Sequence, residues 1–301
     1  MTAEQGHNPV KGVFWMLVTG LCFVAVTALV KMVGPRLPAA ETAFLRYALG
    51  IVFLIPMIKP ILNANLTRRQ VGLFASRGVL HTLGVVLWFF AMARIPIAEV
   101  TAMNYLSPVY VTVGAALFLG EKLAARRILA VVLALIGVLI ILRPGFRELS
   151  SGHFAMLITA LTFAGGYIIA KKLSEEVSAT VVVGMLSVTV TIGLAPLAAA
   201  VWVTPTLGEL GILFAVACFA TAGHYTMTLA FAAAPITVTQ PVSFLQMVWA
   251  VLLGWIGFGE QPDFWVIVGA GVIIAAISFI TWREAVIKRR QVTPLVGQTK
   301  V

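Results

Sequence analysis

Residues 91–122 read AMARIPIAEVTAMNYLSPVYVTVGAALFLGEK, and this apolar run is long enough to cross a bilayer. A second copy begins 139 residues later, where residues 230–261 read AFAAAPITVTQPVSFLQMVWAVLLGWIGFGEQ. Both copies begin with alanines ahead of a proline, Pro96 or Pro235, and both close on a Gly-Glu pair. A repeat at a fixed offset indicates that a structural unit has been duplicated.

The composition places the chain among membrane proteins. Hydrophobic residues make up 60% of it and charged residues 11%, whereas a soluble domain is about a quarter charged. Long apolar runs recur, and each predicts a membrane-spanning helix because backbone groups in lipid must find partners within their own segment. The first run, near residues 12–33, is too long for a signal-peptide core and is predicted to be a retained span.

The apolar runs and the glycine and proline breakers between them predict ten spans. The spans cover residues 13–33, 40–58, 71–91, 97–119, 127–142, 152–170, 179–202, 210–232, 236–258 and 264–282. If the N-terminus is cytoplasmic, 14 of the 21 Lys and Arg residues fall on the inner side and five on the outer side. The positive-inside rule therefore predicts that both termini are cytoplasmic.

The repeat offset covers five spans, and because five is odd the second unit enters the membrane inverted. The predicted fold is an all-α membrane protein of two inverted five-helix repeats, residues 1–147 and 148–282, followed by a basic cytoplasmic tail, residues 283–301. Inverted repeats with a site near the midplane are the architecture of secondary transporters that work by alternating access.

Four motifs resemble those of the EamA-type permeases of the drug/metabolite transporter superfamily, and the resemblance covers essentially the whole chain. The motifs are Leu45-Arg46-Tyr47, Pro96…Pro108…Gly120-Glu121-Lys122, Ile136-Gly137-Val138 and Pro235…Gly259-Glu260. The second half departs from the pattern, because Met247 stands at the counterpart of Pro108 and Ala276 at that of Gly137.

The resemblance implies a carrier of small organic metabolites that works without ATP in the cytoplasmic (inner) membrane. The run over residues 80–127 is similar to bacterial EamA permeases that include riboflavin importers, so riboflavin is the first substrate considered. Amino acids, S-adenosylmethionine and drug-like molecules are the alternatives that the family implies, and uptake and export are both open at this point.

Polar and aromatic residues in the middle of the two copies are the candidates for binding substrate. Polar groups at bilayer depth are costly and usually face the bundle interior. The offset relates Asn104 to Ser243 and Ser107 to Gln246, so two antiparallel helices present amides and hydroxyls at similar depth. This pattern indicates either a substrate cavity or hydrogen bonds between helices. The candidates are Asn104, Tyr105, Ser107, Gln240, Ser243, Gln246 and Trp249, together with Trp88 in the third predicted span.

A second set of residues is ionisable and lies within the spans or at their ends. Histidine changes charge near physiological pH, which suits proton coupling, although a neutral hydrogen-bonding role is also open. Arg46 needs a partner at its depth, and either a structural ion pair with Glu41 or Glu99 or an anion contact would provide one. The candidates for proton coupling or gating are Glu41, Arg46, Arg77, His81, Glu99 and His224, whereas Glu121 and Glu260 are interpreted as helix-end anchors.

Other functional classes are disfavoured. The net charge of +10 belongs to residues between spans and in the tail, where it indicates anionic lipid headgroups as partners and not nucleic acid. Cys22 and Cys218 lie in different spans without metal-ligand spacing, so no metal or other cofactor is predicted. No motif joins the buried serines to the histidines as an intramembrane enzyme requires. A channel is the third class, and non-saturating flux would identify it.

Overall fold

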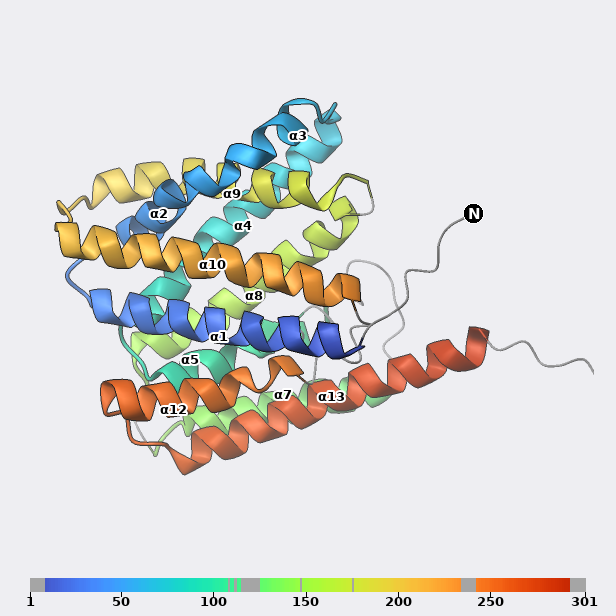
Figure 1. The fold of residues 1–301 in the computed structure, drawn as a ribbon. Coiled ribbons are helices and arrows are strands. Elements are labelled where there is room, and N and C mark those ends of the chain that lie inside the picture. The colour runs from blue at the N-terminus through green and yellow to red at the C-terminus, as the bar shows by residue number, and fades with distance from the viewer. Residues whose placement is uncertain are drawn as a thin grey trace, which may run out of the picture.

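The computed structural model describes residues 9–292 except 108, 111–112, 115–124, 147, 175 and 234–241, and the described part is built from helices (Figure 1). They are α1 Pro9–Val33, α2 Ala39–Leu49, the 3-10 helix η1 Gly50–Met57, α3 Ile58–Leu62, α4 Arg68–Met92, α5 Ile97–Asn104, α7 Ala125–Leu142, α8 Ser151–Ser174, α9 Ala179–Ala200, α10 Leu207–Ala233, α12 Gln246–Phe258 and α13 Phe264–Val292.

The helices are long and apolar enough to make this a multi-pass membrane protein. Five segments among the described residues have the length and hydropathy of a span: Val10–Val33, Arg68–Met92, Ser151–Ala170, Thr180–Ala200 and Leu207–Met227. Shorter apolar helices cover Ile128–Leu142, Gln246–Phe258 and Phe264–Phe279. The predicted boundaries of the corresponding spans agree with most of these helices to within a few residues.

The helices pack in pairs, and each pair joins one helix from the first half of the chain to one from the second half. α1 lies along α10 and α4 lies along α8, while α2 contacts α9, α5 contacts α12 and α7 contacts α13 (Figure 1). In chain order α1 and α8 hold equivalent places in the two halves, as do α4 and α10. The α1–α10 and α4–α8 contacts are therefore one contact made twice, as a pseudo-two-fold relation between two repeats requires.

The start of α1 and the end of α13 lie at the same end of the bundle (Figure 1). The opposite end holds the connections that follow α1, α4, α7, α9 and α12, and we call it the Pro96 end. Its turns use left-handed backbone at the predicted breakers, where Gly34, Gly145 and Gly259 have φ of 69°, 86° and 65°.

Three predicted spans are not continuous α-helices over their described residues, and in the ninth α12 begins only at Gln246, after a turn at residues 244–245. The span predicted over residues 40–58 changes to the 3-10 helix η1 at Gly50, and Pro60, two residues beyond the predicted end, lies inside α3. The span predicted from Ile97 is interrupted at Tyr105, whose N–H bonds to the carbonyl of Ala102. Pro108 lies outside the described residues, but a proline at that position has no N–H to continue the helical ladder.

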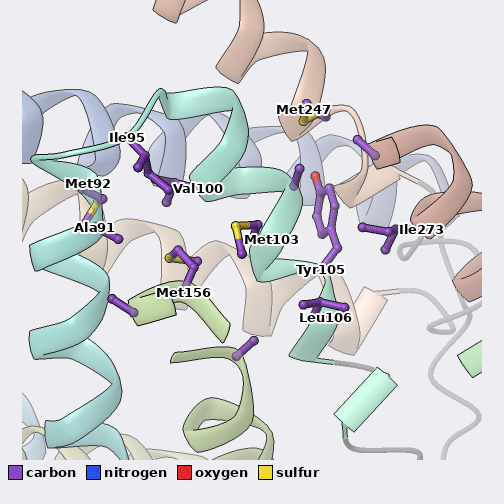
Figure 2. Close-up of a cluster of buried hydrophobic side chains, with 14 of the residues drawn as sticks. Ala91, Met92, Ile95, Val100, Met103, Tyr105, Leu106, Met156, Met247 and Ile273 are labelled. Carbon is purple, nitrogen blue, oxygen red and sulfur yellow. The ribbon is translucent and has the colours of Figure 1, made fainter. Parts of the chain in front are cut away.

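The apolar core lies where α4, α5, α8 and α13 meet. Met92, Met103, Leu106, Met156 and Ile273 are fully buried there (Figure 2). Methionine fills irregular gaps between packed helices, and this cluster adjoins the interruption in the fourth predicted span. The core therefore supports the segment that carries the candidate binding residues.

Candidate functional site

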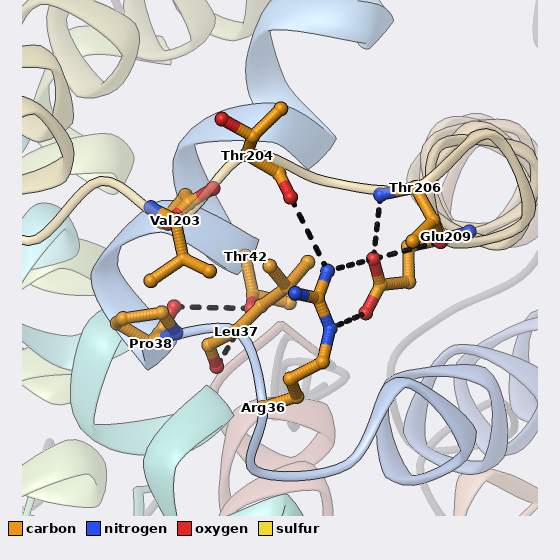
Figure 3. Close-up of polar contacts among 9 residues, drawn as sticks. Arg36, Leu37, Pro38, Thr42, Val203, Thr204, Thr206 and Glu209 are labelled. Carbon is orange, nitrogen blue, oxygen red and sulfur yellow. Dashed lines mark hydrogen bonds and ion pairs between the residues drawn. The ribbon is translucent and has the colours of Figure 1, made fainter.

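Polar side chains tie the two halves together at the Pro96 end. Arg36, in the α1–α2 connection, pairs with Glu209 at the start of α10, and Glu209 also accepts a hydrogen bond from the N–H of Thr206 (Figure 3). Each link joins the first half to the second: Lys31–Glu260, Arg36–Glu209, Glu41–Val203, Glu99–His153 and Arg143–Asp263. The structure therefore has this end closed across the boundary between the repeats.

Glu260 is the centre of another of these links. Its Oε1 lies 2.6 Å from the ammonium of Lys31, and its Oε2 accepts a 2.9 Å hydrogen bond from the N–H of Ile97. Lys31 also donates to the carbonyl of Ile95 at 3.1 Å. One carboxylate thus caps the start of α5 and joins it to α1, in keeping with the helix-end role predicted for it.

The middles of the two copies meet, as the offset predicts. The hydroxyl of Tyr105 lies 3.5 Å from the carbonyl oxygen of Ser243, and its ring packs edge-on against Phe244 with centroids 5.3 Å apart. Asn104 Oδ1 and Ser107 Oγ are buried and have no hydrogen-bonding partner among the described residues. Buried polar atoms are normally paired, so these two are available for a ligand.

An aromatic cluster surrounds the second half of α4. The His81 ring stacks on Phe163 of α8 at 5.0 Å, and its Nε2 lies 2.9 Å from the hydroxyl of Tyr47. Trp88 packs edge-on against the same Phe163, and its indole N–H is buried without an acceptor in the described part of the chain. The cluster supplies apolar ring faces and one unused donor.

The two arginines within the spans are held without carboxylates. The guanidinium of Arg46 lies over the ring of Tyr47 at 3.9 Å, and Arg77 donates to the carbonyl of Val182 at 3.0 Å. Among the described residues neither makes an ion pair. The carboxylates expected to pair with Arg46 are bound elsewhere, so the cation–π contact takes the place of the predicted ion pair.

The two candidate glutamates lie at the Pro96 end. Glu41 is fully buried and accepts a 2.8 Å hydrogen bond from the N–H of Val203. Glu99 lies 2.5 Å from Nε2 of His153, a residue that the sequence analysis did not single out. The only signal for His153 in the sequence was its position, since His153, like Glu41 and Glu99, is the third residue of a helix that follows a turn at this end. His224, in α10, packs edge-on against Phe23 of α1.

The remaining binding candidates are less central. Gln246 begins α12 and faces α1, where a Cβ added to Gly20 would lie 3.7 Å from its Cβ. Trp249 is 37% exposed and shares the exposed apolar face of α12 with Leu252 and Ile256, which argues against a place in the interior. Gln240 lies outside the described residues. No group of three or more His, Cys, Asp or Glu in the described part could hold a metal ion.

Comparison with known proteins matches this architecture to one family over both halves of the chain. The EamA-like transporter family matches residues 10–143 and again residues 150–282. This chain belongs to the EamA-like transporter family. The double match confirms the predicted family and the two repeats, and it makes the chain a transporter and not an enzyme.

Individual relatives cover nearly the whole chain. The riboflavin transporter of Vibrio cholerae is 30% identical over 95% of this chain and 97% of its own length. The pseudopaline exporter CntI of Pseudomonas aeruginosa is 30% identical over 88% of this chain and 94% of its own. A crystal structure with 16% identity has the same fold, with a TM-score of 0.60 over 94% of this chain and 99% of that one.

Proposed function

We propose that this transporter carries a small organic metabolite across the cytoplasmic (inner) membrane by alternating access, and that the metabolite is riboflavin, moved inward. The observation that carries this proposal is a set of buried polar atoms without a hydrogen-bonding partner among the described residues: Asn104 Oδ1 and Ser107 Oγ in the fourth predicted span, and the indole N–H of Trp88, whose ring packs against Phe163 beside His81. A flat heteroaromatic ring needs apolar faces to cover it and a few polar groups along its edge. The Vibrio cholerae relative supports this choice.

The proposed membrane arrangement is ten spans in two inverted repeats, residues 1–147 and 148–282, with both termini cytoplasmic. The start of α1 and the end of α13 lie at one end of the bundle, and this placing and the predicted excess of basic residues on one side support the arrangement (Figure 1). The Pro96 end then faces outward, and the basic tail, residues 283–301, lies against the inner headgroups. Because the repeats are equivalent, exchanging their conformations opens the bundle to the other side.

Uptake of labelled riboflavin into a riboflavin auxotroph is expected to rise when this protein is produced, and the uptake is expected to saturate. Preloading vesicles with unlabelled riboflavin should accelerate entry of the label, because a carrier returns faster when loaded. Absence of uptake from a protein shown to be in the membrane would remove riboflavin as the substrate. Uptake that grows linearly with concentration would indicate a channel.

Export of an anionic metabolite is the second candidate function. Arg46 and Arg77 are cations within the spans that make no ion pair in the described part of the chain, which suits a carboxylate on the substrate. The exporter from Pseudomonas aeruginosa shows that transporters of similar sequence include exporters. Competition in proteoliposomes separates riboflavin uptake from export of an anionic metabolite. If the substrate is anionic, amino acids and other carboxylates should displace labelled riboflavin or be transported in its place. S-adenosylmethionine and drug-like molecules should be tested as competitors in the same assay.

Replacing Asn104 by leucine is expected to raise the KM for riboflavin about tenfold and to leave the melting temperature unchanged. The change keeps the volume but removes a buried amide oxygen that has no hydrogen-bonding partner in the described part of the protein. A hydrogen bond to a ligand contributes about 0.5–1.5 kcal/mol, which sets the expected size. Asn63→Ala, in the exposed turn after α3, is the control. A lowered melting temperature with unchanged KM would show that Asn104 is structural.

A further inference from the structure

Arg46 and Arg77 are linked by a contact between Tyr47 of α2 and His81 of α4. The guanidinium of Arg46 lies over the Tyr47 ring at 3.9 Å, and the hydroxyl of Tyr47 lies 2.9 Å from Nε2 of His81. Arg77 is four residues before His81 on α4, so these two side chains share one face of that helix. The two arginines therefore belong to one cluster of side chains.

The second half of the chain completes this cluster. Arg77 donates to the carbonyl of Val182 in α9 at 3.0 Å. Tyr167 of α8 lies within electrostatic reach of Arg77, and His224 of α10 lies within reach of both arginines. The cluster thus takes basic and phenolic side chains from both repeats, and a carrier with inverted repeats has its site between them.

Both arginines lie deep in the bundle. Arg46 is about 10.5 Å along α2 from its start at the Pro96 end, and Arg77 is about 13.5 Å along α4 from its start at the opposite end. Neither is close enough to a helix end to be a simple headgroup anchor. A cation at such a depth in a bilayer is costly unless it is paired or reaches water.

The described part of the chain provides neither arginine with a carboxylate. The groups that act electrostatically on Arg77 are the phenols of Tyr47 and Tyr167. Within the described residues, Arg77 makes one side-chain hydrogen bond, to Val182, and Arg46 makes none. Most N–H donors of the two guanidinium groups are therefore available.

Packed side chains do not seal the cluster. Arg46, His81 and His224 are half-buried, and Tyr167 is 50% exposed. A carboxylate or a phosphate would supply what the arginines lack, because it carries negative charge and accepts paired hydrogen bonds from a planar guanidinium.

We propose that Arg46 and Arg77 form a binding site for an oxyanion, either a carboxylate or a phosphate, inside the bundle. The site rests on the proposed transport function and adds an anionic ligand to it. It adjoins the aromatic cluster, because the His81 ring that contacts Tyr47 also stacks on Phe163 at 5.0 Å. The oxyanion is either a group on the transported molecule or, where that molecule is uncharged like riboflavin, a separate anion bound beside it.

The direct test measures anion binding without transport. Inorganic phosphate and acetate, each replacing chloride at constant ionic strength, should raise the melting temperature of the purified full-length protein, and the rise should saturate. Arg46→Gln and Arg77→Gln should each raise the apparent Kd about tenfold, because each removes charge-assisted hydrogen bonds.

Arg94→Gln is the matched control and should leave the Kd unchanged. Arg94 also lies over a ring, that of Phe90 at 3.6 Å, and also donates to a backbone carbonyl, but it is exposed at the Pro96 end. Arg46→Lys keeps the charge and loses the planar guanidinium, so its Kd should fall between those of the wild type and Arg46→Gln.

The proposal is overturned if neither anion gives a saturating rise in the wild type. It is also overturned if Arg46→Gln binds both anions as tightly as Arg94→Gln does. If Arg77→Gln does not fold, Arg46→Gln and Arg46→Lys decide the result, because lysine retains a cation at this depth.

Uptake of labelled riboflavin into proteoliposomes separates the two sources of the oxyanion. A separate anion carried in exchange should accelerate entry of the label several-fold when phosphate or acetate is placed inside, in the wild type and not in Arg46→Gln. An oxyanion that belongs to the transported molecule should instead make external phosphate or acetate a competitive inhibitor. An unchanged rate in both arrangements would overturn the link between this site and transport. If no variant carries riboflavin, the proposed substrate fails and the melting experiment still decides the oxyanion site.

Discussion

Replacing Gly269 by leucine is expected to leave little folded transporter in the membrane, whereas the same change at Gly271 is expected to be tolerated. A Cβ at Gly269 would lie 2.5 Å from the carbonyl oxygen of Gly137, and a Cβ at Gly137 would lie 2.7 Å from the carbonyl oxygen of Gly269. A Cβ at Gly271 would meet nothing within 4 Å. Because the obstructing atoms belong to the backbones, α7 and α13 would have to separate.

Over-packing a core usually lowers the free energy of unfolding by about 1–3 kcal/mol. We expect Gly269→Leu to reach the upper end of this range, because a backbone carbonyl oxygen cannot rotate away as a side chain can. The measurement is the yield of monodisperse protein in detergent together with its melting temperature. Both should fall sharply for Gly269→Leu and stay near the wild-type values for Gly271→Leu, which lies on the same helix. Equal behaviour of the two variants would contradict the close crossing of α7 and α13.

This crossing shows what the repeat offset does and does not predict. The offset relates Gly137 to Ala276, yet the residue that Gly137 touches is Gly269. The offset also relates Gly269 to Ala130, and both alanines are buried. Small residues therefore occupy both equivalent positions of the crossing. Sequence identifies equivalent residues, whereas contact depends on how two helices cross.

The helix boundaries were largely predictable, because apolar length and Gly or Pro breakers are local properties. The exceptions are the second, fourth and ninth predicted spans, which are interrupted near Gly50, Tyr105 and Phe244, and the tenth, in which α13 continues to Val292 beyond the predicted end at residue 282. Hydropathy does not distinguish an α-helix from a 3-10 helix of the same composition. A proline can act on the turn before it, so the interruption at Tyr105 precedes Pro108 in the sequence.

The candidate site was only partly predictable for a similar reason. The offset relates Tyr105 to Phe244, and these two rings do pack together, because both lie at the middle of equivalent spans. The same reasoning gave Trp249 a place in the interior, but helix rotation turns it to the exposed face of α12. His153 was missed because its position as the third residue of a helix is, by itself, a weak signal. Its partner on α5 becomes visible only when α8 is packed against it.

The Pro96 end should open when Glu260 is replaced by glutamine. The carboxylate holds the start of α5 through the N–H of Ile97 and through Lys31, and its side chain is 15% exposed. Breaking a buried pair costs about 3–5 kcal/mol, and partial exposure reduces this to about 2 kcal/mol. A loss of this size raises the population of the open end about 30-fold. Glu176→Gln is the matched control, because the Arg69–Glu176 pair lies at the other end and is more exposed.

The opening can be measured at Ile97, which is fully buried beside this contact. In a background with Cys22 and Cys218 replaced by alanine, Ile97→Cys should react slowly with a membrane-impermeant maleimide applied from outside. Adding Glu260→Gln should speed the reaction by at least tenfold. Glu176→Gln should leave the labelling rate unchanged. This control also removes an ionised, paired carboxylate, because the Arg69 hydrogen bond holds the pKa of Glu176 below its usual range. Labelling only from the cytoplasmic side would reverse the proposed orientation, and an unchanged rate would show that Glu260 does not hold this end closed.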